Sequence, residues 1–321
     1  MDLILDTIGG LLLQGVQMLL VLALAPLLLG FTRTVKARML RRRGPPLLQP
    51  YRDLLKLARK EAVIADNASW LFRAAPYMIF SATWVAAALV PTFATGLIFG
   101  WVGDLIAIIA LVGAARFFLA LAGMDVGTSF GGIGSSREML FASLSEPGMI
   151  MIVFTVALVA GSTQLSYIAA FLQDNATLRV SLGMALVALI IVALAENARI
   201  PVDNPATHQE LTMVHEAMVL EYSGRHLAMI ELAAAVKLLL YLSLIACLFV
   251  PWGLAPAGSG IAAYATGVAT YLGKLLAGGF LLVLLETSIA KMRVFRVPQF
   301  LGTALMLGLL GTLLLFVSRS F

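Results

Sequence analysis

Long apolar runs separated by short polar connections dominate the chain. A helix that crosses a bilayer needs about 20 mainly apolar residues, and eight runs are predicted to form such spans. They lie at residues 8–30, 74–96, 103–122, 147–161, 179–196, 227–250, 261–287 and 299–317. Together they leave no room for a separate soluble domain. The pattern therefore predicts an all-α, polytopic membrane protein in which residues 1–321 form a single transmembrane domain.

The first apolar run is expected to be a span and not a signal peptide. Acidic Asp2 and Asp6 stand where a signal peptide carries basic residues, and the run is longer than the usual apolar core of such a peptide.

Charge predicts the orientation of the spans. The chain is 61% hydrophobic and 12% charged, whereas soluble domains are about half apolar and a quarter charged. If the spans alternate, 17 of the 22 lysines and arginines fall on one side, and only Arg179 and Arg319 on the other. Positive residues gather on the cytoplasmic side. Both termini are therefore expected outside a bacterial or archaeal cytoplasmic membrane, and the net charge of +5 reflects topology, not nucleic-acid binding.

A basic cytoplasmic loop is predicted at residues 31–73. Gly44, Pro45 and Pro46 interrupt any helix there, and Tyr51–Ala62 has the alternation of an amphipathic helix. The loop could anchor to anionic lipid, at about 1 kcal/mol for each cation, or it could dock a soluble partner. The residues expected to dock a partner are Arg33, Lys36, Arg38, Arg41, Arg42, Arg43, Arg52 and Lys56, with Arg137 and Glu138 from the next cytoplasmic loop.

A second cytoplasmic loop is predicted at residues 123–146, where four glycines between 127 and 134 favour a flexible or tightly turned backbone. The glycine spacing matches no phosphate-binding motif. Ser135 or Ser136 is expected to cap a helix that starts at Arg137. Glu146 directly precedes Pro147 and an apolar run, so it is either a proton site or an interfacial acid in water.

Several charged residues lie within or close to the predicted spans. Arg116 is expected either to face the protein interior or to reach the interface, and Lys237 and Lys274 lie deep in apolar runs. Glu231 and Glu286 accompany them. Such groups indicate buried ion pairs, which could be structural or could form a proton relay.

Titratable residues are concentrated in a third cytoplasmic segment, residues 196–226. Pro201 and Pro205 predict a non-helical turn, after which a helix is expected from Ala206 to about Tyr222, with a left-handed Gly224 at its end. Carboxylates beside apolar spans can exchange protons near neutral pH. The alternative is a solvated acidic loop. The residues of this segment that are candidates to carry protons are Glu196, Asp203, His208, Glu210, His215, Glu216 and Glu221.

The sequence argues against a metal or catalytic centre held by this chain alone. Cys247 is the only cysteine, so an iron–sulfur cluster with four thiolates and an intrachain disulfide are both excluded. His208 and His215 are two helical turns apart, and no second histidine follows His215 at the spacing of a zinc protease. No catalytic residue, metal ligand or bound cofactor is therefore predicted here.

Several segments together resemble one family, the membrane subunit shared by respiratory complex I (subunit 1, or H) and the energy-converting NiFe hydrogenases, which include formate hydrogenlyase. The segments read RRRGPPLLQPYRDLLKL, GDLIAIIALVGAARFFLALAGMDVGTSFGGIGSSREM, ENARIPVDNP, QEL, EYSG and PWG. The hydrogenase branch is more similar, because Pro46 and Leu47 stand where the complex I pattern continues to a second arginine.

The resemblance implies a non-catalytic subunit that links a soluble redox arm to antiporter-like membrane subunits and carries a buried acidic path. It implies that the NiFe centre and the iron–sulfur clusters are held by the large and small hydrogenase subunits. Glu146, Asp203, Glu210 and Glu221 match acidic positions of the family, whereas His208 stands in a segment that is more acidic in many members.

Two other functions are open besides that of a proton-conducting hydrogenase subunit. A quinone-chamber subunit of a complex I-like NADH:quinone oxidoreductase is the second reading, and a free-standing ion transporter is the third, although no internal symmetry supports it. The residues expected on the path are Glu146, Glu196, Asp203, His208, Glu210, His215, Glu216, Glu221, Glu231, Lys237, Lys274 and Glu286.

Overall fold

The computed structural model describes residues 2–175, 179–202, 213–256 and 258–319. In these ranges the regular structure is helical, with short 3₁₀ turns at Ile98–Trp101 and Val294–Arg296. The α-helices are α1 (Asp2–Met39), α2 (Gln49–Ala58), α3 (Trp70–Leu89), α4 (Leu105–Asp125), α5 (Ser129–Ala160), α6 (Leu165–Asp174), α7 (Val180–Glu196), α8 (His215–Val219), α9 (Gly224–Phe249), α10 (Ile261–Ser288) and α11 (Val297–Arg319).

The all-α, polytopic prediction is confirmed. Within the described residues, six helices are long and apolar enough to cross a membrane, namely α1, α4, α5, α9, α10 and the segment that includes α11. The apolar α7 is shorter, at 17 residues. Helix α3 coincides with the second predicted span, but it carries Arg73 and two tryptophans and is not one of the six. Each of the eight predicted spans therefore overlaps a helix, although the second extends past the end of α3 at Leu89. The number of helices that cross the membrane stays a prediction.

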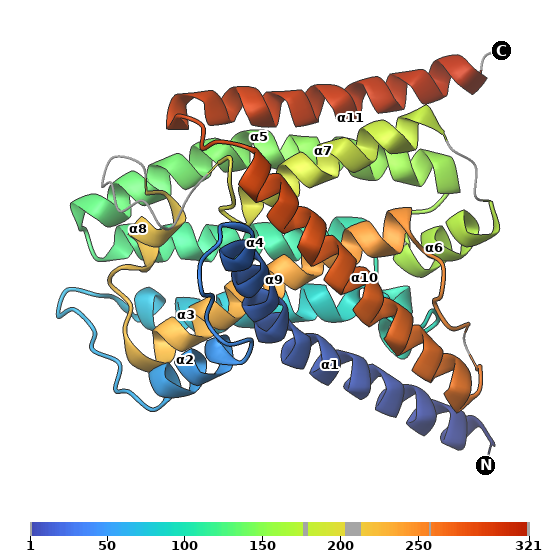
Figure 1. Ribbon diagram of the computed structural model, residues 1–321, viewed down its shortest axis with the longest axis horizontal. Coiled ribbons are helices and arrows are strands. Elements are labelled where there is room, and N and C mark those ends of the chain that lie inside the picture. The colour runs from blue at the N-terminus through green and yellow to red at the C-terminus, as the bar shows by residue number, and fades with distance from the viewer. Residues whose placement is uncertain (1, 176–178, 203–212, 257, 320–321) are drawn as a thin grey trace.

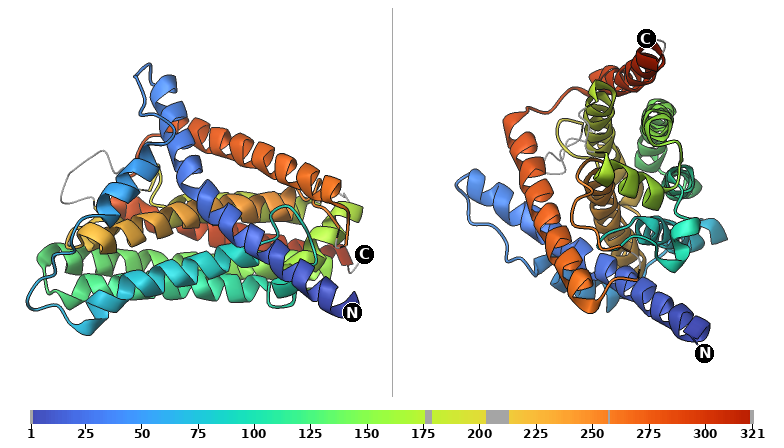
Figure 2. Two further views of the ribbon diagram at one scale, coloured as in Figure 1. Left: turned by 90° about the horizontal axis from the view of Figure 1, so that it is seen from below. Right: turned by 90° about the vertical axis from the view of Figure 1, so that its right-hand side faces the viewer.

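The long helices form a bundle that two oblique helices cross. In Figure 1, α3, α4, α5, α7, α9 and α11 run in roughly the same direction, whereas α1 and α10 cross them at an angle. Figure 2 shows the same oblique course of α1 and α10 from two other sides. Helix α9 lies centrally and packs against α1, α3, α7 and α10. Its Val236, Leu239 and Leu240 are completely buried. Ala235, Leu238 and Tyr241 are buried as well, so this part of α9 is enclosed on nearly every side.

Polar caps position the helices that carry the site. The Asp104 carboxylate accepts a hydrogen bond from the Ile106 backbone N–H at 2.8 Å and so starts α4. The Thr128 hydroxyl accepts one from the Gly131 N–H at 3.2 Å and starts α5. Helix α5 ends at Gly161, whose φ of +79° suits glycine. These caps place α4 and α5 side by side.

The glycine-rich segment is not a loop, which corrects the prediction for residues 123–146. Helix α5 is continuous from Ser129 to Ala160 and includes Pro147, and Thr128 caps it instead of Ser135 or Ser136. Its glycines serve close packing, because a Cβ on Gly131 would strike the backbone carbonyl of Gly123 on α4. Buried Ser135 instead donates hydrogen bonds to the carbonyls of Ala120 (2.9 Å) and Gly131 (2.8 Å).

The segment between α7 and α9 also differs from its prediction. Of the helix expected over 206–222, only His215–Val219 is helical in the part that is described, and residues 203–212 lie outside it. Gly224 does adopt a left-handed φ of +54°, but it opens α9 instead of ending a helix. A Cβ there would collide with the backbone carbonyl of Glu61, so the glycine permits a close approach of the basic loop.

The basic loop is more helical than expected. Helix α1 extends to Met39, so Arg33, Lys36 and Arg38 belong to its last turns. The amphipathic helix predicted after the proline break is confirmed as α2, Gln49–Ala58, which starts two residues earlier and ends four residues earlier.

Candidate functional site

A buried ion cluster lies where α4, α5 and α7 meet. The Arg116 guanidinium, on α4, forms ion pairs with Glu196 at the end of α7 and with Glu146 on α5. Arg116 and Glu196 are only 7% and 8% exposed. Ser145 joins them, since its hydroxyl donates to Glu196 Oε1 at 2.7 Å and accepts from Arg116 Nη1 at 2.9 Å. Mutual pairing is what makes such charges tolerable in an apolar surrounding.

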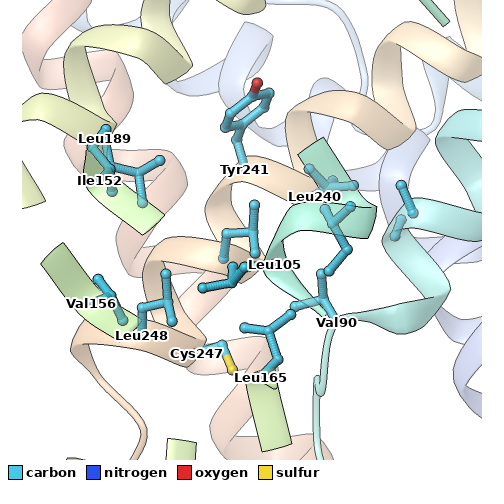
Figure 3. Packing of buried hydrophobic residues seen from close by; sticks show 14 of the residues in the cluster. Val90, Leu105, Ile152, Val156, Leu165, Leu189, Leu240, Tyr241, Cys247 and Leu248 are labelled. Carbon is cyan, nitrogen blue, oxygen red and sulfur yellow. The ribbon is translucent and has the colours of Figure 1, made fainter. Parts of the chain in front are cut away.

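The cluster contains two carboxylates and one guanidinium. Glu196 Oε2 is buried without a hydrogen-bond partner. Tyr241 of α9 borders the same small space. In Figure 3 its ring lies beside the apolar cluster, and its hydroxyl points away from Cys247 and Leu248. An unsatisfied carboxylate oxygen near a hydroxyl can bind a proton or accept a hydrogen bond from a water molecule.

A second ion cluster joins α1, α10 and the turn after α7. Glu286 is 3% exposed, and its two oxygens accept from Lys36 Nζ at 2.7 Å and from Arg199 Nη1 at 3.3 Å. The three residues come from distant parts of the chain, so the pairs fix the C-terminal ends of α1 and α10 relative to α7.

A polar cavity of about 280 Å³ lies next to this second cluster. It is bordered by α1, α8, α9, α10 and the turn after α7, and both signs of charge line it. Its charged and titratable lining residues are Arg33, Lys36, Arg199, His215, Glu216, Glu231 and Glu286.

His215 stands at the inner end of this polar cavity. Desolvation by burial, with a further contribution from Lys237, lowers the pKa of His215 to about 3. The imidazole is therefore neutral at physiological pH, with one nitrogen that can donate and one that can accept a proton.

Two smaller cavities continue from His215 to the buried ion cluster. The first, of about 30 Å³, shares His215 and Ile230 with the polar cavity and is also lined by Glu138, Lys237 and Arg116. The second, of about 10 Å³, lies beyond Arg116 and is lined by Ser145, Glu146, Glu196 and Tyr241. Spaces of these sizes are at or above the minimum for a single water. The three cavities, here called the polar file, share lining residues from end to end.

The polar file collects part of the predicted path. Glu216, Glu231, Glu286 and His215 line the large cavity, Lys237 the connecting one, and Glu146 and Glu196 the buried cluster. Other predicted residues are not brought there. Glu221 is exposed in the turn before α9, and Lys274 of α10 lies near Cys247. Asp203, His208 and Glu210 lie outside the described residues.

The residues predicted to dock a partner divide into two groups. Arg33 and Lys36 line the polar cavity and Glu138 the connecting one, while Arg137 Nη1 donates to the Met213 carbonyl at 2.9 Å and so holds the segment before α8. The others are exposed on one side of the chain, on the end of α1, in the turn that follows and on α2. This exposed basic surface consists of Arg38, Arg41, Arg42, Arg43, Arg52 and Lys56.

Sequence reasoning missed three members of the polar file. Arg199 lies just after a predicted span within the ENARIP segment, and Ser145 directly precedes Glu146, so both positions carried a signal. Tyr241 lies in an uninterrupted apolar run and gave none. Among the described residues no group of three His, Cys, Asp or Glu side chains could hold a metal ion.

Comparison with known proteins gives consistent results. A family model described as NADH dehydrogenase matches residues 13–317. Formate hydrogenlyase subunit 4 of Escherichia coli is 34% identical over 288 residues, covering 88% of this chain and 92% of that protein. Hydrogenase-4 component C of the same organism is 35% identical over 277 residues, covering 86% and 87%.

A solved structure shows the same fold. A chain of the membrane-bound sulfane sulfur reductase, an archaeal respiratory membrane complex, superposes with a TM-score of 0.80 at 19% identity. The match covers 95% of this chain and 99% of that one.

Proposed function

Because the chain belongs to the NADH dehydrogenase family, the complex I subunit 1 family predicted from its motifs, we propose that it conducts protons along the polar file as the membrane subunit of a NiFe hydrogenase or formate hydrogenlyase-type complex. The observation that carries the proposal is the polar file itself. It joins a polar cavity at the cytoplasmic ends of the helices to two carboxylates, Glu196 inside the bundle and Glu146, whose side chain is 49% exposed.

The buried cluster can hold a proton because of its charge balance. One guanidinium compensates one carboxylate, so Glu146 and Glu196 together leave one excess negative charge. Protonation of either carboxylate removes that excess without leaving Arg116 unpaired. The proton can then pass between two carboxylates that share a guanidinium.

His215 is suited to supply this cluster. As a neutral imidazole between the two larger cavities of the polar file, it can donate a hydrogen bond to a water in one cavity and accept one from a water in the other, and so connect the side of Glu216 and Glu231 to the carboxylates of the buried cluster. Conduction requires no metal or cofactor on this chain.

The exposed basic surface serves as the docking site for the soluble redox arm. Six cations on α1, the adjoining turn and α2 present a positive face to a soluble partner. The proposed partners there are the large and iron–sulfur hydrogenase subunits, which hold the NiFe centre and the clusters, and antiporter-like subunits are the partners in the membrane. The proposed location is the cytoplasmic membrane of a bacterium or archaeon, with both termini outside.

Charge-neutral variants of the buried cluster test the proposal. Glu196→Gln and Glu146→Gln, in inverted vesicles that contain the assembled complex, should lower proton uptake at least tenfold, about 1.4 kcal/mol in the barrier, while hydrogen evolution with a soluble dye persists. Glu61→Gln, an exposed carboxylate remote from the polar file, is the matched control. Unchanged uptake in both cluster variants would exclude this path.

The alternative is a quinone-chamber subunit of a complex I-like oxidoreductase. The two Escherichia coli relatives favour the hydrogenase reading, since their names are those of hydrogenase components. Nickel in the purified complex, without inhibitor-sensitive reduction of a quinone analogue, is the expected result. Quinone reduction without nickel would favour the alternative.

A further inference from the structure

An apolar slot lies between α7, α9 and α10, next to the polar file, with which it shares Asn197, Arg199 and Tyr241. Helix α9 packs against both α7 and α10, whereas α7 and α10 are not in extended contact in the described part of the chain. The space between them is a cavity of about 110 Å³. Its apolar lining includes Ala193 and Leu194 of α7, Leu242 and Ile245 of α9, and Gly278 and Leu281 of α10.

The slot is long, narrow and open towards lipid. Its lining on α7 runs from Ile190 to Asn197, a rise of about 10 Å. A Cβ on Gly278 would lie 3.4 Å from Leu242 Cδ2, so a side chain larger than alanine at this position would occupy the slot. Leu281 is 57% exposed at its edge. A packed helix is about 10 Å across, so a slot of this volume cannot admit one. A segment of one hydrocarbon chain would fit, with the rest of the chain in the bilayer.

The cytoplasmic end of the slot is polar and positive. Arg199 and Asn197 border both the slot and the polar cavity. Asn197 donates to the Ala193 carbonyl at 2.8 Å, but its Oδ1 is buried without a partner. Arg199 is the charged residue in the slot's lining, and Glu286, with which it pairs at 3.3 Å, lines the polar cavity but not the slot.

We propose that the slot binds one anionic phospholipid, with an acyl chain between α7 and α10 and its phosphate at Arg199. The apolar walls suit the chain, and a phosphate oxygen would form charge-assisted hydrogen bonds with the guanidinium. A hydroxyl-bearing headgroup such as glycerol would supply the donor that Asn197 Oδ1 lacks. The cytoplasmic leaflet is the anionic one, which matches a cation at this end of the slot. This site does not depend on proton conduction.

Lipid retention by the purified full-length chain tests the proposal. The protein, delipidated and then incubated with phosphatidylglycerol or phosphatidylcholine, is examined by native mass spectrometry. We expect phosphatidylglycerol to be retained about tenfold more than phosphatidylcholine, the ratio that corresponds to about 1.4 kcal/mol. Gly278→Leu should abolish this retention. Gly273→Leu on the same helix should not, because no atom lies within 4 Å of an added Cβ there.

A second variant guards against a folding defect in the first. Ala193→Leu fills the slot from α7 and should give the same loss of phosphatidylglycerol. Equal retention of the two lipids would overturn the anionic site. Retention by both slot-filling variants, or loss from Gly273→Leu as well, would also overturn it, because the lipid would then bind elsewhere.

Discussion

Arg116 and Glu196 form an ion pair in which both side chains are more than nine-tenths buried, although 80 positions separate them in the chain. The pair ties the middle of α4 to the end of α7, and Glu146 of α5 shares the same guanidinium. Three helices are thus joined by charge inside an apolar bundle, at the inner end of the polar file.

Removal of the guanidinium should be strongly destabilising. Arg116→Met leaves Glu196 buried without a counter-charge, and breaking a buried pair in this way costs about 3–5 kcal/mol. The unfolding free energy in mixed detergent micelles measures the loss. The double variant Arg116→Met/Glu196→Gln should recover most of it, because it also removes the orphaned charge. A double variant no more stable than Arg116→Met would contradict this account of the pair.

Neutralising Glu286 should loosen the C-terminal ends of α1 and α10. Glu286→Gln leaves Arg199 and Lys36 without a counter-charge and should lower the unfolding free energy by about 2 kcal/mol. Lys36→Met should cost less, since Lys36 is more exposed and Arg199 still pairs with the carboxylate. Thermal unfolding of the two variants under the same conditions gives the comparison, and a reversed order would show that Lys36 is the dominant partner.

His215 predicts a loss of stability on acidification. Its pKa is lowered in the folded protein to about 3, against an ordinary value of 6.5, so the unfolded chain binds the extra proton first. The contribution of the neutral imidazole to the free energy of unfolding is complete above pH 6.5. It is lost as the pH falls towards 3, by at most about 1.4 kcal/mol per pH unit. Unfolding midpoints from pH 7.5 to 4 should fall less steeply for His215→Gln than for the natural chain. Parallel curves would argue against a buried neutral imidazole.

The glycines of α5 offer a test of its packing on α4. Gly131→Ala should be strongly destabilising, because the new Cβ would strike the Gly123 carbonyl. Gly132→Ala has open space and should be neutral or stabilising by up to about 1 kcal/mol, the difference in helix propensity. The unfolding free energies of the two variants decide the matter. Equal effects would mean that α4 and α5 do not approach so closely.

Hydropathy alone was enough to predict most of the fold. Each apolar run became a helix because a backbone in lipid must satisfy its own hydrogen bonds. The first turns of α5, residues 129–136, escaped prediction because several glycines near a polar cluster are typical of a loop, whereas here Gly131 and Gly134 permit contact with α4 and α8. Local propensity cannot reveal that a neighbouring helix needs the space.

The site was predictable by residue type but not by partner. Charges in apolar runs, such as Lys237 and Glu286, indicate a buried polar system from the amino-acid sequence alone. That Arg116 pairs with Glu146 and Glu196 depends on how α4, α5 and α7 meet, which no spacing in the sequence encodes. Tyr241 was undetectable, since an aromatic residue in a span is ordinarily part of the core.

The length of α1 determines which of the two ion clusters is sensitive to the salt concentration. Its 38 residues extend about 57 Å, almost twice the roughly 30 Å of a hydrocarbon core, and even a 40° tilt leaves more than 10 Å outside. The basic end of α1 therefore lies in the headgroup region or in water, and Lys36 with it. Mobile ions can reach the pair between Lys36 and Glu286, but they cannot reach the one between Arg116 and Glu196. Raising the ionic strength should therefore weaken the ion pair between Lys36 and Glu286 and leave the one between Arg116 and Glu196 intact.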